Sequence, residues 1–165
     1  APVDGVDQAG LAGQQVDVPR ETLALVIEGC DVPTVSLPEL NEIDFGSFAE
    51  GPLDLYRAWA SSHSPDEPAP GGGDSRASAA ARFARGLRAA LALPAPHVLL
   101  VWHALAIRYV IDAAEGLVPA PLMITPVQHA VPHRLGRAEV ERAADLLETW
   151  SREPRFRALP GTMTT

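Results

Sequence analysis

The stretch Val98-Leu-Leu-Val-Trp-His-Ala-Leu-Ala-Ile-Arg-Tyr-Val-Ile-Asp112 decides the predicted fold. Its first four residues are all aliphatic, which is typical of a strand that is buried on both faces. The apolar spacing of the residues after His103 then predicts a helix that packs back on that strand. His103 would therefore end a buried strand, at the edge where α/β sheets bind their ligands.

A helix that begins directly after His103 would offer an anion site. The first N–H groups of a helix have no partner within it, and the positive end of the helix dipole lies there. Position 103 holds no Ser, Thr, Asp or Asn that could cap these groups. The backbone N–H of Ala104 is thus a candidate phosphate-binding group beside His103. The alternative is that His103 only ends a strand and bonds to a loop carbonyl.

Helical and extended patterns alternate along the rest of the chain. The helical patterns cover 17–29, 52–62, 75–93, 104–115 and 137–150, and the extended patterns cover 32–37, 40–48, 98–102 and 121–135. Such alternation favours an α/β fold, a three-layer sandwich with a mostly parallel sheet. The chain has 165 residues, which fit a single domain.

The charge and the composition argue against several classes of partner. The net charge is −8, which disfavours nucleic acid and anionic membranes as partners. No apolar stretch approaches the roughly 18 residues that span a bilayer. The one cysteine, Cys30, excludes an internal disulfide and is predicted to be a small buried apolar residue. This cysteine usage suits a reducing compartment, and we expect a cytoplasmic protein. The oligomeric state stays open.

Two further motifs precede the 98–112 stretch. They are Leu37-Pro-Glu-Leu-Asn-Glu-Ile-Asp-Phe-Gly-Ser-Phe48 and Pro70-Gly-Gly-Gly-Asp-Ser75. In this order and at these distances, the three motifs resemble the histidine phosphatase superfamily, the phosphoglycerate-mutase-like phosphatases. The resemblance covers about residues 20–152.

The resemblance implies a function and a set of site residues. It implies a phosphomonoesterase that works through a phosphohistidine intermediate, needs no cofactor, and acts on a phosphorylated small molecule or binds inorganic phosphate. Glu42 falls on the family's proton-donating glutamate, and His103 falls on its second active-site histidine. Without the resemblance, Glu42 would be interpreted only as part of an acidic surface.

The chain departs from the family pattern at the defining element. The family has an amino-terminal strand that ends in Arg-His-Gly, whose histidine is phosphorylated during turnover. No such tripeptide occurs here. The family's phosphate-binding arginine stands four residues before a helix threonine matched by Thr22, and this position holds Val18, with Arg20 two residues away. Ala104 replaces a glycine but keeps its N–H, and Asp74 replaces the glutamate of the glycine-rich loop.

Two functions follow as alternatives. The first is a phosphomonoesterase domain that is incomplete at its amino terminus, lacks the first strand, and is inactive as written because the nucleophile is absent. The second is a non-catalytic pseudophosphatase that binds an anion or a partner. Sequence upstream of residue 1 would distinguish them, because an Arg-His-Gly behind an aliphatic strand would favour the first.

Two other patterns have simpler interpretations. His129 and His133 stand four residues apart, as in some zinc sites, but a proline lies between them and no Glu or Cys ligand is near. We therefore expect no metal there. Three arginines follow one another along the predicted helix 75–93, at positions 82, 85 and 88, and are expected to form a solvated surface.

Overall fold

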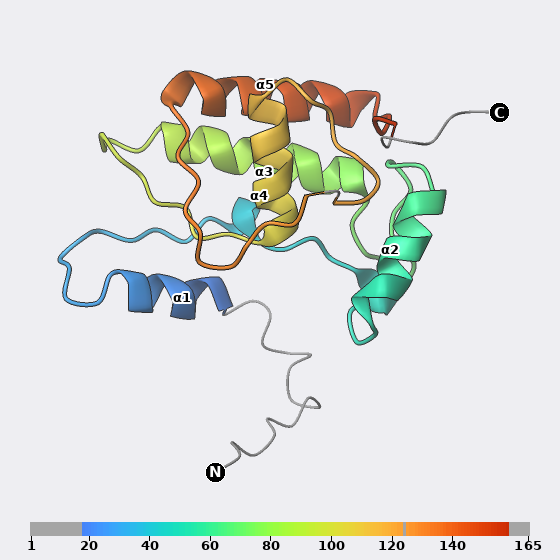
Figure 1. Ribbon diagram of the computed structural model, residues 1–165, viewed down its shortest axis with the longest axis horizontal. Helices are drawn as coiled ribbons and strands as arrows, with labels where there is room; N and C mark the ends of the chain where they lie inside the picture. Colours follow the sequence, from blue (N-terminus) through green and yellow to red (C-terminus); the bar gives the residue numbers. More distant parts are fainter. Residues whose placement is uncertain (1–17, 124, 159–165) are drawn as a thin grey trace, which may run out of the picture.

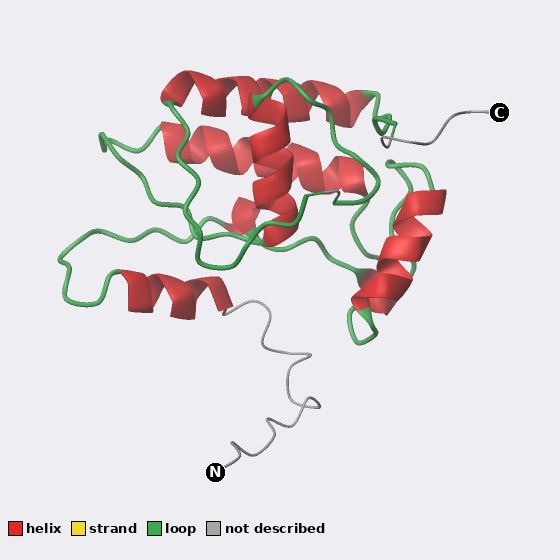
Figure 2. Ribbon diagram, in the orientation of Figure 1, coloured by secondary structure: helices red, strands yellow, loops and turns green. Residues whose placement is uncertain are grey.

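The computed structural model describes residues 18–123 and 125–158. Within these ranges the chain forms five α-helices and two short 3₁₀-helices joined by loops (Figures 1 and 2). In chain order they are α1 (Val18–Val26), η2 (Pro38–Leu40), η3 (Gly46–Phe48), α2 (Leu53–Ser62), α3 (Arg76–Leu91), α4 (Ala104–Ala114) and α5 (Arg137–Arg152). All five predicted helices are present, and their ends differ from the predicted ones by at most three residues.

The predicted α/β sandwich with a parallel sheet is wrong, because the described residues contain no strand (Figure 2). Residues 98–102 have no regular secondary structure, and within the described ranges no backbone hydrogen bonds join them to another segment as in a sheet. The same holds for residues 32–37. An aliphatic run favours extended backbone, whereas a sheet also needs a partner strand. Val98 and Leu99 are accordingly 41% and 56% exposed instead of buried on both faces.

Three helices form the core of the molecule. Helices α3 and α5 lie side by side, and α4 crosses them and packs mainly on α5 (Figure 1). Their contact faces are built largely from alanine, which lets helices approach closely because it projects a single methyl group. The buried alanines are Ala77, Ala79, Ala80, Ala84 and Ala90 on α3, Ala106, Ala113 and Ala114 on α4, and Ala143 and Ala144 on α5. Phe83, Leu87 and Leu147 fill the remaining space and are fully buried.

Local hydrogen bonds determine where the core helices begin. The Ser75 hydroxyl accepts from the Ser78 N–H at 3.0 Å, and the Ser78 hydroxyl accepts from the Ser75 N–H at 3.0 Å, which is a complete capping box for α3. At α5 the Glu139 carboxylate accepts from the Gly136 N–H at 2.6 Å. The start of α4 differs, since its N-cap His103 makes no side-chain capping bond. That helix end is therefore open to other acceptors.

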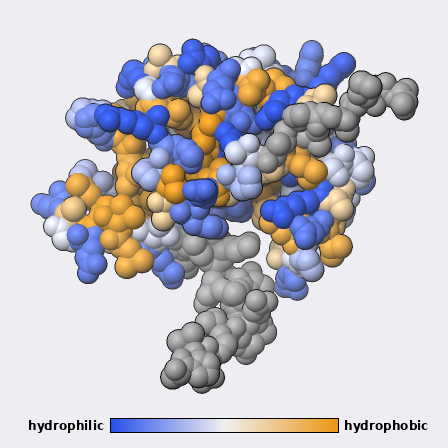
Figure 3. Space-filling model, in the orientation of Figure 1, coloured by the Kyte–Doolittle hydropathy of each residue, from blue (hydrophilic) through white to orange (hydrophobic). Residues whose placement is uncertain are grey.

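Helices α1 and α2 lie outside this core (Figure 1). Leu25 and Val26 on α1 are 74% and 57% exposed, and Figure 3 shows apolar side chains gathered over this helix at the lower left of the view. Cys30, just after α1, is also exposed. The prediction of a buried cysteine was wrong because α1 and the segment after it are not covered by the α3–α4–α5 core.

A buried carboxylate ties the end of the described chain to α4. Asp112 pairs with Arg108 Nη2 through Oδ1 at 3.1 Å and with Arg157 Nη2 through Oδ2 at 2.7 Å. Arg157 also donates its backbone N–H to the Pro119 carbonyl and its Nε–H to the Val118 carbonyl, both at 3.0 Å. The residues after α5 are thus fastened to the loop after α4 through Arg157.

In the part of the chain that the structure describes, no helix has the length and the apolar character needed to cross a bilayer.

Candidate active site

The structure brings Glu42 and His103 together. The Glu42 Oε2 atom lies 3.2 Å from His103 Nδ1, and the two side chains are 25% and 14% exposed. Glu42 lies in the loop after η2, and His103 is the residue directly before α4. A carboxylate and an imidazole at this distance can hold one proton between them and pass it to a bound group. The roles inferred from the family motifs thus fall on two side chains that form a pair.

His103 places this pair at the open end of α4. Its backbone is extended, with φ −91° and ψ 152°, and its carbonyl accepts from the Ile107 N–H at 3.0 Å to begin the helix. Ala104 is the first helical residue, as predicted. His103 contacts Glu42 through Nδ1. Within the described residues no hydrogen bond involves its other ring nitrogen, Nε2. Both Nε2 and the Ala104 N–H are therefore available to an anion.

The backbone around Glu42 is held by Arg82 of α3. Arg82 donates to the carbonyls of Asn41 at 2.6 Å and Glu42 at 3.1 Å, and it pairs with the Asp74 carboxylate at 2.7 Å. The Glu42 Oε1 atom accepts from the N–H of Ile43, which is 2% exposed and anchors the loop in the core. The expectation of a solvated Arg82 was therefore wrong. Helical spacing alone could not show that two loop carbonyls face this position.

The glycine-rich loop docks on the loop that carries Glu42. The Asp74 N–H donates to the Asp44 carbonyl at 2.8 Å, the Asp44 N–H donates to the Asp74 carboxylate at 3.1 Å, and the Ser47 N–H donates to the Pro70 carbonyl at 2.6 Å. Gly46 sits at the closest approach, with φ +56°. The motifs at residues 37–48 and 70–75 thus form one unit, which holds the loop that carries Glu42.

We expect Gly46→Ala to destabilise the fold by about 2–4 kcal/mol, because a Cβ at Gly46 would lie 2.2 Å from the Pro70 carbonyl oxygen. The positive φ adds strain for any residue with a side chain. Gly72→Ala is the matched control, since Gly72 also has a positive φ but nothing lies within 4 Å of its added Cβ. Urea unfolding would measure both variants. Equal losses at Gly46 and Gly72 would contradict the close docking of the two loops.

An aromatic cluster packs behind the Glu42 loop. Tyr56 of α2 contacts Phe45 and Phe48 edge-on, with ring centroids 4.7 and 5.8 Å apart. Burial raises the pKa of the Tyr56 hydroxyl above its ordinary value, the positive charge of Arg76 opposes this rise, and the Glu42 carboxylate adds to it. The sequence pattern marked Tyr56 only as an apolar position of a helix, and it gave Arg76 no role.

The other residues considered from the sequence are exposed, or their side chains are not described. Arg20 and Thr22 are exposed residues of α1, and the side chain of Val18 lies outside the described residues. His129 and His133 are exposed, and the described part of the chain contains no group of three or more His, Cys, Asp or Glu side chains that could hold a metal ion.

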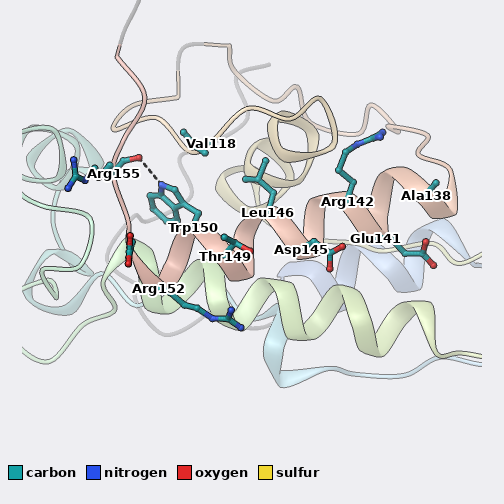
Figure 4. Close-up of a pocket in the computed structure, with 11 residues that line it drawn as sticks. Val118, Ala138, Glu141, Arg142, Asp145, Leu146, Thr149, Trp150, Arg152 and Arg155 are labelled. Atoms are coloured by element: carbon teal, nitrogen blue, oxygen red, sulfur yellow. Dashed lines mark hydrogen bonds between the residues drawn. The ribbon is translucent and has the colours of Figure 1, made fainter.

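A groove of about 1100 Å³ lies along α5, apart from Glu42 and His103 (Figure 4). Val118, Leu146 and Trp150 supply its apolar lining. Trp150 donates its Nε1–H to the Arg155 carbonyl at 2.8 Å, so its polar atom is already occupied. The charged lining residues include both arginines and acids, which favours no single charge class of ligand. The volume of this groove is therefore no indication that it is the active site.

Comparison with known families assigns the chain to a family. A family model described as the histidine phosphatase superfamily (branch 1) matches residues 19–148, a span that contains both Glu42 and His103. The chain belongs to the histidine phosphatase superfamily. Searches of curated proteins and of solved structures give no match. The recognition from three ordered motifs is thus confirmed.

Proposed function

We propose that this chain is a phosphomonoesterase-type domain whose Glu42–His103 pair binds the phosphoryl group of a small molecule. The observation that carries the proposal is the 3.2 Å contact between the two side chains at the uncapped start of α4. A phosphoryl group spreads negative charge over its oxygens, so a site for it must present donors. His103 Nε2 and the Ala104 N–H supply donors at one place.

Each member of the pair has a distinct role in this proposal. His103 and the Ala104 N–H contact the phosphoryl oxygens, and Glu42 gives a proton to the leaving alcohol. The Glu42 loop is fixed by Arg82 and by the docked glycine-rich loop, which keeps the carboxylate beside the imidazole. The nucleophile of the family is a histidine in Arg-His-Gly, and this tripeptide does not occur in the chain. No cofactor is required for this chemistry.

A second candidate is a pseudophosphatase, a domain that binds an anion or a partner without turnover. This candidate needs no Arg-His-Gly, and that tripeptide does not occur in the 165 residues. The donors described above belong to the start of α4 and to His103, so they do not depend on that tripeptide. Both candidates therefore share an anion site and differ only in catalysis. A cytoplasmic location and the exclusion of nucleic acid remain predictions from the composition.

We expect inorganic phosphate to raise the melting temperature of the chain. A ligand that binds only the folded state stabilises it by mass action, and phosphate at ten times its Kd should give roughly 3–5 °C for a domain of this size. His103→Ala should reduce the shift to less than half at the same concentration. His133→Ala is the matched control, because His133 is an exposed histidine of the loop before α5.

Differential scanning calorimetry with sodium chloride at equal ionic strength would separate specific binding from screening. Equal phosphate shifts in the parent, His103→Ala and His133→Ala would contradict an anion site at His103.

A further inference from the structure

Arg76, the first residue of α3, is a buried cation without a carboxylate partner. It is 6% exposed, and within the described residues no Asp or Glu lies within ion-pair distance of it. Its Nη1 donates to the Tyr109 hydroxyl at 3.3 Å, and its guanidinium lies over the Tyr56 ring, 5.0 Å from the ring centroid. Two neutral tyrosines therefore surround a full positive charge.

Such a charge is costly unless something compensates it. Arginine cannot lose its proton in a protein, so Arg76 must stay charged where it is buried. Replacing buried charges by apolar residues of similar volume is often neutral or stabilising, so the folded state alone gives little reason for an arginine here. An anion that binds beside Arg76 would supply the missing charge.

Two polar atoms of this cluster have no hydrogen-bond partner. Arg76 Nε and the Tyr56 hydroxyl are both fully enclosed, and neither has a partner with hydrogen-bond geometry in the described part of the chain, although the Arg76 guanidinium is near enough to lower the pKa of Tyr56. Buried donors are satisfied in most proteins, and a bound ion is one explanation of the exceptions. Arg76 Nε–H and the Tyr56 O–H are two donors on adjoining side chains, which is an arrangement that one oxyanion can accept from.

Tyr56 connects this cluster to the proposed active site. Burial is the main cause of the raised pKa of its hydroxyl. The charge of Arg76 lowers this pKa, and the charge of Glu42 raises it. Tyr56 also contacts Phe45, which belongs to the same loop as Glu42. The cluster therefore adjoins the loop that carries Glu42.

Helix α2 carries Tyr56 and forms the outer side of this cluster. It lies apart from the α3–α4–α5 core and packs on η3 (Figure 1). Its Leu53 and Leu55 are 46% and 57% exposed, whereas Tyr56 on its inner side is 2% exposed. Because the Tyr56 hydroxyl and Arg76 Nε are both enclosed, an anion can reach them only if α2 shifts outward.

We propose that Arg76 and Tyr56 form an oxyanion subsite beside the Glu42–His103 pair, with Arg76 Nε and the Tyr56 hydroxyl donating to the same anion. This inference rests on the proposed function, which supplies a phosphoryl group as the anion in this part of the molecule. The shared chemistry is a small oxyanion, phosphate or carboxylate.

Isothermal titration of the full chain with inorganic phosphate, and separately with acetate, tests the subsite. Arg76→Met removes the charge but keeps most of the side-chain volume, and we expect at least tenfold weaker phosphate binding, as for loss of a charge-assisted hydrogen bond. Its melting temperature without phosphate should be no lower than that of the parent. Arg85→Met is the matched control, because Arg85 is an exposed arginine of the same helix, and it should bind like the parent.

Tyr56→Phe keeps the aromatic packing and removes only an unpartnered hydroxyl, so the variant should fold like the parent and bind phosphate about threefold to tenfold more weakly. If Arg76→Met folds, phosphate affinity within twofold of the parent overturns the proposal. If it does not fold, the Tyr56→Phe titration decides, and unchanged affinity overturns it. Acetate binding with the same dependence on these residues would extend the subsite to carboxylates, and phosphate binding alone would restrict it to phosphoryl groups.

His103→Ala, titrated alongside, separates this inference from the proposed function. Loss of binding in His103→Ala but not in Arg76→Met would leave the proposed function standing and overturn the subsite. Loss in Arg76→Met but not in His103→Ala would support the subsite and contradict the role of His103.

Discussion

Purified chain 1–165 is expected to hydrolyse an aryl phosphate no faster than buffer. Removing the nucleophile that forms a covalent intermediate typically lowers turnover by about 10⁴–10⁶-fold, and no histidine stands in an Arg-His-Gly context here. His103 does not replace it in this prediction, because it matches the family's second histidine, and we expect its Nε2 to donate to the phosphoryl oxygens while Nδ1 contacts Glu42 at 3.2 Å. Release of the phenol chromophore would measure the rate.

The matching variant is His103→Ala, measured at the same enzyme concentration. Turnover above buffer that disappears in this variant would contradict the prediction, and it would show that a residue of this chain serves as the nucleophile. Turnover that persists unchanged in the variant would indicate a contaminating phosphatase.

Asp112→Ala is expected to lower the free energy of unfolding by about 3–5 kcal/mol. The Asp112 side chain is 9% exposed and compensates both Arg108 and Arg157, so its removal leaves two partly buried cations without their partner. The C-terminal residues of the described chain should also loosen, because Arg157 holds them to Val118 and Pro119. Urea unfolding would measure the loss, and hydrogen exchange at residues 153–158 would report the loosening.

Asp145→Ala provides the control for this prediction. Asp145 also pairs with an arginine, Arg88, at 2.7 Å, but both side chains are exposed, at 68% and 47%. Exposed ion pairs contribute about 0–1 kcal/mol because water screens them and side-chain entropy opposes them. A loss at Asp112 no larger than the loss at Asp145 would show that the buried network does not stabilise the fold.

The helices could be predicted from the sequence because their signals are local. Ser75, two residues before the alanine-rich run, marks the start of α3, and apolar spacing marks the inner faces of α4 and α5. The sheet was predicted wrongly because pairing is not local. Residues 98–102 have the composition of a strand, but nothing in that composition tells which segment, if any, would pair with them.

The site could be predicted only in part, for a similar reason. Glu42 and His103 were found through motif order, and the structure places them in contact. Arg82 and Arg76 were not found, because their importance depends on what faces them. Arg82 faces two loop carbonyls and Arg76 faces two tyrosines, and both sets of neighbours come from distant parts of the chain.

The alanine faces of α3, α4 and α5 restrict how this protein can change over evolutionary time. A core of large side chains can accept compensating substitutions, in which one residue becomes smaller while its neighbour becomes larger. An alanine side chain has almost no volume to lose. At Gly86 of α3 the limit is sharper, since an added Cβ would lie 2.5 Å from the Leu40 side chain. Neutral drift in these helices is therefore confined to their outer faces. The lineage can diversify its surface and its loops while the spacing of the three helices, and with it the position of His103, stays nearly constant.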